Sequence, residues 1–104
     1  MRLAHEMNQK KDNRPTRRFE AIHEGGNNEW LLLRDIHELK TGKLFRDHCW
    51  VRWTWQLAKL KKYSLINFTA TINSYPFNQE RNGRKRTIWK KELIRICNVK
   101  LAEV

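Results

Sequence analysis

The residues of this sequence that could carry chemistry are mainly cationic and aromatic. Between residues 79 and 91 the chain places six cations against a single acid, Glu80, which would concentrate positive potential in one place. Arginine in such a stretch can stack on bases or contact phosphates through two hydrogen bonds. The six cations are Arg81, Arg84, Lys85, Arg86, Lys90 and Lys91. We consider two explanations, a binding site for an anion and a solvated loop that keeps small proteins apart.

The five tryptophans are the second set of candidates, because flat aromatic faces beside cations suit stacked bases. Trp50 alternates with Arg52, and both would face away from Cys49 and Val51 if this segment is extended. This alternation favours an exposed stacking role for Trp50.

The other aromatic residues are harder to assign, since a tryptophan in a small β-domain is more often part of the core than an exposed surface on which a base can stack. We assign Trp30 and Trp53 to the core. Trp89 and Phe77 flank the basic stretch, where they could grip a base or pack the loop down.

Histidine, cysteine and acidic residues show no spacing typical of a metal or catalytic site. There is no C-x-x-C and no H-x-x-x-H, and no acidic cluster suits two-metal hydrolysis. Asp35, Asp47 and His48 are the acids and base available, but Asp47 with His48 fits a structural polar contact or a turn cap better than acid–base work. We expect a protein that is not an enzyme and needs no metal or cofactor. A nuclease or other hydrolase is the alternative.

The overall charge favours an anionic partner. Lys and Arg number 22 against 11 Asp and Glu, which gives 104 residues a net charge of +11. Such a balance indicates nucleic acid, an anionic membrane surface or an acidic protein, and the aromatic content favours nucleic acid. No apolar run could span a bilayer and no secretory signal is visible, so we expect a cytoplasmic protein without a membrane partner. Cys49 and Cys97 are expected to remain thiols.

These side chains must be positioned by a mainly β fold, because short apolar runs alternate with turn residues from residue 17 onward. The length fits one domain. Residues 1–16 are polar and basic and are predicted to form an arm that orders only on a partner. Residues 17–104 are predicted to form the folded domain.

Five strands are predicted in that domain, over residues 17–24, 29–39, 44–55, 66–75 and 87–101. A helix is the alternative for residues 29–39, whose apolar block fits either a strand buried on both faces or one bent by a bulge. In the last strand Leu93 is expected to share a side with Arg95 and Cys97. Residues 55–65 suggest a short helix or a wide crossover. Pro76 is expected to end the fourth strand, because proline cannot donate to a ladder.

This element order is that of a small, partly open five-stranded OB-like Greek-key barrel, although small SH3-like barrels share much of the pattern. An OB barrel binds along its second and third strands, flanked by the loops between strands 1 and 2 and between strands 4 and 5. The basic residues 78–86 would then be the 4–5 loop at the rim of the groove. Further cations that could contact phosphates are Arg17, Arg18, Lys59, Lys61 and Lys62.

The sequence also resembles a group of small bacterial and phage-associated proteins. They share an Asp-His-x-Trp strand, which here is Asp47, His48 and Trp50. A second strand of the pattern apolar-x-Phe-x-Ala-x-apolar-x-x-Tyr follows, and here it comprises Ile66, Phe68, Ala70, Ile72 and Tyr75. The resemblance covers residues 17–104 and implies an OB-like barrel from a phage or mobile-element setting, without a reaction or catalytic residues. Those relatives would have a glycine before the fourth strand, which KKYSL lacks.

Two functions follow from these observations. The first is a nucleic-acid-binding module for single-stranded DNA or RNA, because reading a duplex would require a recognition helix that the sequence does not show. The second is a small protein that docks on a nucleoprotein complex, such as a CRISPR effector, and assists or inhibits it. An exposed strand edge could also make a homodimer.

Overall fold

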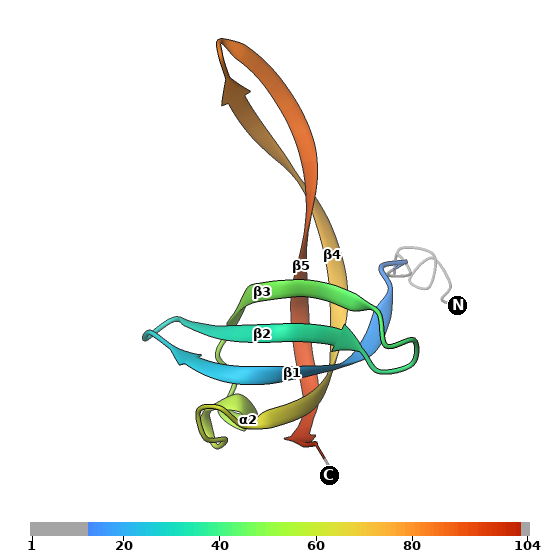
Figure 1. The fold of residues 1–104 in the computed structure, drawn as a ribbon, viewed down its shortest axis with the longest axis vertical. Helices are drawn as coiled ribbons and strands as arrows, with labels where there is room; N and C mark the ends of the chain where they lie inside the picture. The colour runs from blue at the N-terminus through green and yellow to red at the C-terminus, as the bar shows by residue number, and fades with distance from the viewer. Residues whose placement is uncertain (1–12, 103–104) are drawn as a thin grey trace, which may run out of the picture.

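The computed structural model describes residues 13–102 and contains one antiparallel sheet of five strands (Figure 1). The strands are β1 (Thr16–Gly26), β2 (Trp30–Glu38), β3 (Leu44–Arg52), β4 (Leu65–Arg81) and β5 (Arg84–Leu101), with a short helix, α2 (Trp55–Ala58). The mainly β prediction is confirmed. Most of the predicted basic arm lies outside the described residues, and its last residue, Thr16, already belongs to β1.

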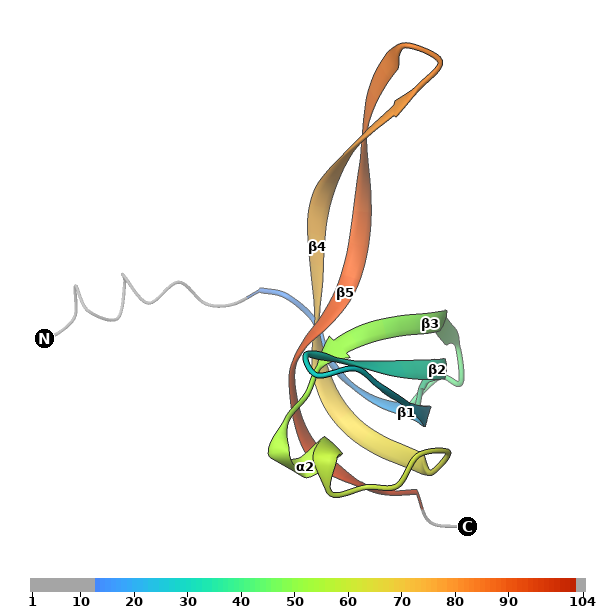
Figure 2. The ribbon, with the colours of Figure 1, turned by 90° about the vertical axis from the view of Figure 1, so that its left-hand side faces the viewer.

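The strand order across the sheet is β3-β2-β1-β4-β5. The sheet bends so that its two edge strands, β3 and β5, contact each other (Figure 2). No ladder of hydrogen bonds joins these edges in residues 13–102, so the sheet is not closed into a barrel.

The core lies inside this bend, and all five strands and α2 contribute buried residues to it. Phe19 and Ala21 pair with Phe68 and Ile66, and all four side chains are fully buried. The rings of Phe19 and Phe68 stack with centroids 5.7 Å apart. The predicted alternation of both strands is therefore confirmed, up to Ala70, which is also buried.

β2 is a strand, so the helical alternative for its residues is wrong. Leu31 and Leu33 are fully buried while Leu32 between them is half-buried. Asp35 has a φ of 52° and forms a bulge, because two residues of β2, Asp35 and Ile36, oppose one residue of β1 there. The bulge returns Ile36 to the core side, which is one of the two structures that the apolar block predicted.

The segment between β3 and β4 contains a single helical turn, as predicted. Thr54 caps α2, because its Oγ1 accepts the N–H of Leu57 at 3.1 Å. Leu57 is fully buried, and its carbonyl lies 3.2 Å from Nε2 of the buried His23. Nδ1 of that ring accepts the N–H of Gly25 at 3.2 Å, which identifies Nε2 as the donor.

Two bulges change which residues of β5 face the core. Arg95 and Asn98 have φ values of 54° and 51°, and at each place two residues of β5 oppose one of β4. The residues of β5 that pack against the core are consequently three apart, Leu93, Ile96 and Val99. The predicted strict alternation of this strand, with Leu93, Arg95 and Cys97 on one side, is wrong for this reason.

The predicted 4–5 loop is in fact the end of a long two-stranded ribbon (Figure 1). β4 continues through Pro76. Proline lacks the N–H of other residues, but one edge of β4 is free along the ribbon, so no hydrogen bond to a further strand is lost there. The strands pair from Ser74 opposite Lys91 to Arg81 opposite Arg84. We call residues 74–91 the ribbon. Its turn is only Asn82 and Gly83, both at positive φ, as a two-residue hairpin turn requires.

Candidate nucleic-acid interface

A groove runs between β3 and the base of β5. It consists of two adjoining hollows of about 480 and 430 Å³, which share Trp30, Trp50 and Glu92 as lining residues. We call it the β3–β5 groove. The first hollow is also lined by Asn27, Arg46, His48, Cys49, Tyr75 and Lys91. The second is also lined by Arg52, Thr54, Leu93, Ile94, Arg95 and Ile96.

Two tryptophans in this groove are partly exposed. Trp50 is 52% exposed, and Cys49 and Val51 beside it are buried, so the predicted exposure of Trp50 is confirmed. Trp30 is 36% exposed, which makes its assignment to the core wrong. The guanidinium carbon of Arg52 lies 4.7 Å from the centroid of the Trp30 ring. Trp30 and Arg52 are direct neighbours across β2 and β3, so this cation–π pair is built into the sheet.

Trp30 is held in place by the turn before β2. The side-chain oxygen of Asn27 accepts the N–H groups of Glu29 and Trp30, both at 2.9 Å. The carbonyl oxygen of Asn27 accepts Nε1–H of Trp53 at 2.7 Å, which ties the turn to the end of β3. Trp53 is half-buried and packs against the core, so its predicted assignment to the core is confirmed in part. One wall of the groove is thus preorganised.

The charge in the groove is mainly positive. Arg46, Arg52 and Lys91 line it and are not in ion pairs with any described residue. The one acid that lines it is Glu92, whose Oε2 accepts a hydrogen bond of 2.7 Å from Asn73. The sequence pattern did not single out Arg46, although it alternates with His48, Trp50 and Arg52 along β3 and that period could have identified it.

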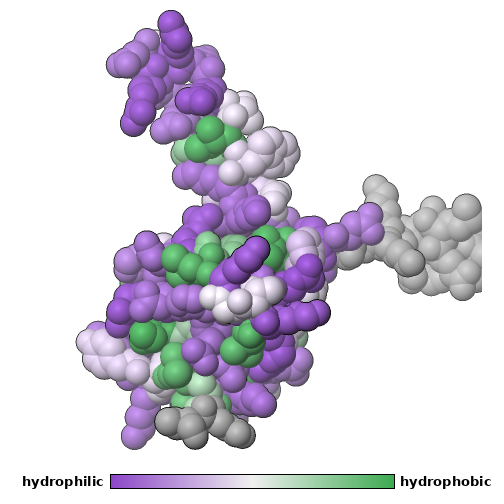
Figure 3. Space-filling model, turned by 45° about the vertical axis from the view of Figure 1, so that its right-hand side comes forward, coloured by the Kyte–Doolittle hydropathy of each residue, from purple (hydrophilic) through white to green (hydrophobic). Residues whose placement is uncertain are grey.

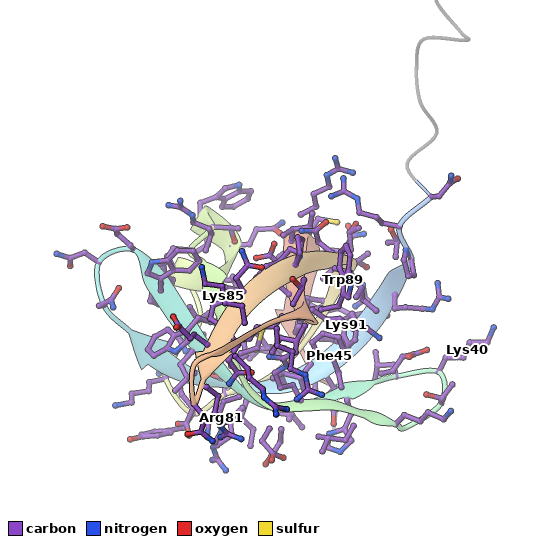
Figure 4. The ribbon with its side chains drawn as sticks, turned by 90° about the horizontal axis from the view of Figure 1, so that it is seen from above. Lys40, Phe45, Arg81, Lys85, Trp89 and Lys91 are labelled. Atoms are coloured by element: carbon purple, nitrogen blue, oxygen red, sulfur yellow. The ribbon has the colours of Figure 1, made fainter. Side chains whose placement is uncertain are left out.

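The ribbon carries its cations on two faces. Residues that pair directly share a face of the ribbon, and so do pairs that are two residues apart along the strands. The pair Gln79 and Arg86 therefore lies on the same face as the pair Arg81 and Arg84. These four side chains line a further hollow of about 700 Å³ at the tip, together with Asn82 and Lys85. The register assigns Lys85 and Trp89 to the opposite face of the strands, and both lie along the ribbon in the view down its axis (Figure 4).

Trp89 and Phe77 of the ribbon do not pack its tip against the main sheet. Trp89 is 68% exposed and Phe77 is 41% exposed, and the register places them on opposite faces. Nζ of Lys90 lies 3.8 Å from the centroid of the Phe77 ring. Apolar residues form a band part-way along the ribbon below a hydrophilic tip (Figure 3).

Other predicted cations lie away from the groove. Lys59, Lys61 and Lys62 follow α2, and α2 lies at the opposite end of the molecule from the ribbon tip (Figure 1). Arg17 forms an ion pair of 3.7 Å with Glu38, and Arg18 donates to Oγ1 of Thr69 at 2.8 Å. Neither of these arginines lines the groove.

No group of three or more His, Cys, Asp or Glu side chains that could hold a metal occurs in residues 13–102. His48 lines the groove, whereas Asp47 precedes it on β3 and does not. Burial raises the pKa of the Cys49 thiol above its ordinary value of 9.0. In the same range of residues, no helix has the length and apolar character needed to cross a bilayer.

Comparison with known protein families, characterised proteins and solved structures yields no match to this chain. The resemblance to small phage-associated proteins therefore stays a prediction.

Proposed function

We propose that this protein binds single-stranded nucleic acid in the β3–β5 groove and performs no catalysis. The observation that carries the proposal is the position of two partly exposed tryptophans, Trp30 and Trp50, among three cations that form no ion pair with a described residue. Bases would stack on the tryptophans while Arg46, Arg52 and Lys91 contact phosphates. Stacking tolerates any base, so we expect little sequence preference.

We also propose that the bent sheet is a variant of the OB architecture. The strand order, the helical turn between β3 and β4, and the approach of β3 to β5 all agree with that topology. In an OB barrel the ligand lies on the second and third strands, between the first and last hairpin loops. Trp30, Trp50 and Arg52 lie on β2 and β3, between the Asn27 turn and the ribbon.

The test is a titration of labelled single-stranded DNA and RNA of about eight nucleotides, within the 4–16 that one such sheet accommodates. Removing a stacking ring costs about 1–3 kcal/mol, so Trp50→Ala should weaken binding by about 5- to 150-fold. Trp55→Ala is the matched control, because Trp55 is also exposed but does not line the groove. Equal losses in both variants, or no binding by the unaltered protein near physiological salt, would refute the proposal.

Docking on a nucleoprotein complex is the second candidate. It is favoured by the ribbon, which projects from the sheet with both edges free and with Trp89 exposed as a possible interface anchor. A docking protein would hold no naked oligonucleotide and would require the assembled complex. The titration above separates the two functions.

A further inference from the structure

The ribbon has no partner within the described chain that would explain its length. Eight residue pairs, from Ser74 with Lys91 to Arg81 with Arg84, extend past the main sheet. At about 3.3 Å per residue this is roughly 26 Å of two-stranded structure. A ribbon of two strands is only marginally stable alone, because neither face is covered. Trp89 and Phe77, exposed on opposite faces, indicate that a ligand covers the ribbon.

The charge of the ribbon identifies that ligand as a polyanion. Six of its residues are cations and one, Glu80, is an acid. Among residues 13–102 no ion pair neutralises any of the six cations. Arg81, Arg84 and Arg86 line one hollow at the tip together with Gln79, Asn82 and Lys85. Three guanidinium groups and an amide around one hollow supply the donors that phosphate oxygens accept.

The shape of the ribbon favours a B-form duplex over other polyanions. The major groove of B-DNA is about 12 Å wide and admits a two-stranded β-ribbon. The major groove of A-form RNA is too narrow and deep for side chains to read. A ribbon of about 26 Å would follow roughly eight base pairs, at 3.4 Å per pair.

The ribbon and the β3–β5 groove form one continuous surface. Tyr75 and Lys91 belong to the first pairs of the ribbon and also line the hollow that contains Trp50. A single DNA strand that leaves the groove past Lys91 would therefore meet a DNA duplex lying on the ribbon. We propose that the protein recognises a junction between single-stranded and duplex DNA, with the single strand in the groove and the ribbon in the major groove of the duplex. This proposal rests on the proposed function of the groove.

The experiment compares three labelled DNAs: a single strand of about eight nucleotides, a blunt duplex slightly longer than the ribbon, and a junction that joins them. The unaltered protein should bind the junction at least about tenfold tighter than either part, because two linked sites reinforce each other. The variant Arg81→Ala/Arg84→Ala/Arg86→Ala should lose this preference and keep its affinity for the single strand. The control Lys59→Ala/Lys61→Ala/Lys62→Ala removes the same charge elsewhere and should keep the preference.

Several results would overturn the proposal. One is a junction preference that survives in the arginine variant, and another is a loss of single-strand and junction affinity by the same factor. Equal binding of the matching RNA junction would overturn the assignment to a B-form duplex. Failure of the unaltered protein to bind the single strand would instead refute the function of the groove, whatever the ribbon does.

Discussion

At the scale of single residues, the faces of the strands decide which aromatic groups can meet a ligand. The exposure of Trp50 was predictable, because it alternates with buried Cys49 and Val51 in an extended segment. The exposure of Trp30 was not, since Trp30 opens a block of four apolar residues that alternation alone cannot divide. The bonds from Asn27 to the start of β2 decide which of those four residues faces outward.

Gly26 determines whether that turn can form, and its replacement gives the first prediction. A Cβ at Gly26 would lie 2.0 Å from the carbonyl oxygen of Trp30, a backbone atom that cannot rotate away. We expect Gly26→Ala to lower the free energy of unfolding by about 1–3 kcal/mol, as for other overpacked sites. Thermal unfolding measures this, and Asn28→Ala in the same turn should leave the midpoint unchanged. A midpoint for Gly26→Ala equal to that of the control would mean that the turn rearranges freely.

At the scale of elements, the existence of the five strands followed from the sequence but several of their details did not. Asp35, Arg95 and Asn98 form bulges at positive φ. Asp and Asn adopt this conformation more often than other non-glycine residues, but too rarely for the residue type alone to locate a bulge, and Arg has no such preference. The ribbon was missed for another reason. Asn82-Gly83 is a strong hairpin signal, but the expectation that Pro76 ends β4 is wrong, because a proline ends a strand only where its N–H is needed.

The ribbon should behave as a cooperative unit separate from the main sheet, which is the prediction at this scale. Gly83 and Gly42 are both turn glycines, with φ values of 78° and 75°, and a Cβ added at either would meet open space. Alanine at such a φ costs about 1–2 kcal/mol. We expect Gly83→Ala to speed amide hydrogen exchange by about 5- to 30-fold in residues 75–90 and to leave the thermal midpoint unchanged.

Gly42→Ala is the matched control, because Gly42 lies in the turn between β2 and β3 of the main sheet. It should lower the thermal midpoint and leave exchange at the ribbon tip unaffected. A lower midpoint for Gly83→Ala would show instead that the ribbon unfolds together with the core.

At the scale of the whole molecule, the cations spread along its longest dimension of 53 Å. The ribbon tip lies at one end and α2 at the other, with β3 between them (Figure 1). Lys59, Lys61 and Lys62 follow α2 directly, and the β3–β5 groove is lined by residues of β3 and the base of β5. Composition predicted an anionic partner, but it could not predict this separation. Which cations act together depends on the approach of β3 to β5, two strands that are far apart in the chain.

This separation predicts how salt affects the binding of a short single strand. Each phosphate contact contributes about −0.7 to the slope of log K against log salt for single strands. Arg46→Ala/Arg52→Ala removes two cations from the groove and should make the slope for an oligonucleotide of about eight nucleotides less steep by roughly 1.4. Lys59→Ala/Lys61→Ala/Lys62→Ala removes three cations near α2 and should leave the slope unchanged, because none of them lines the groove. Binding curves at four or more salt concentrations give both slopes. A larger change in the lysine variant than in the arginine variant would mean that the strand follows α2 rather than the groove.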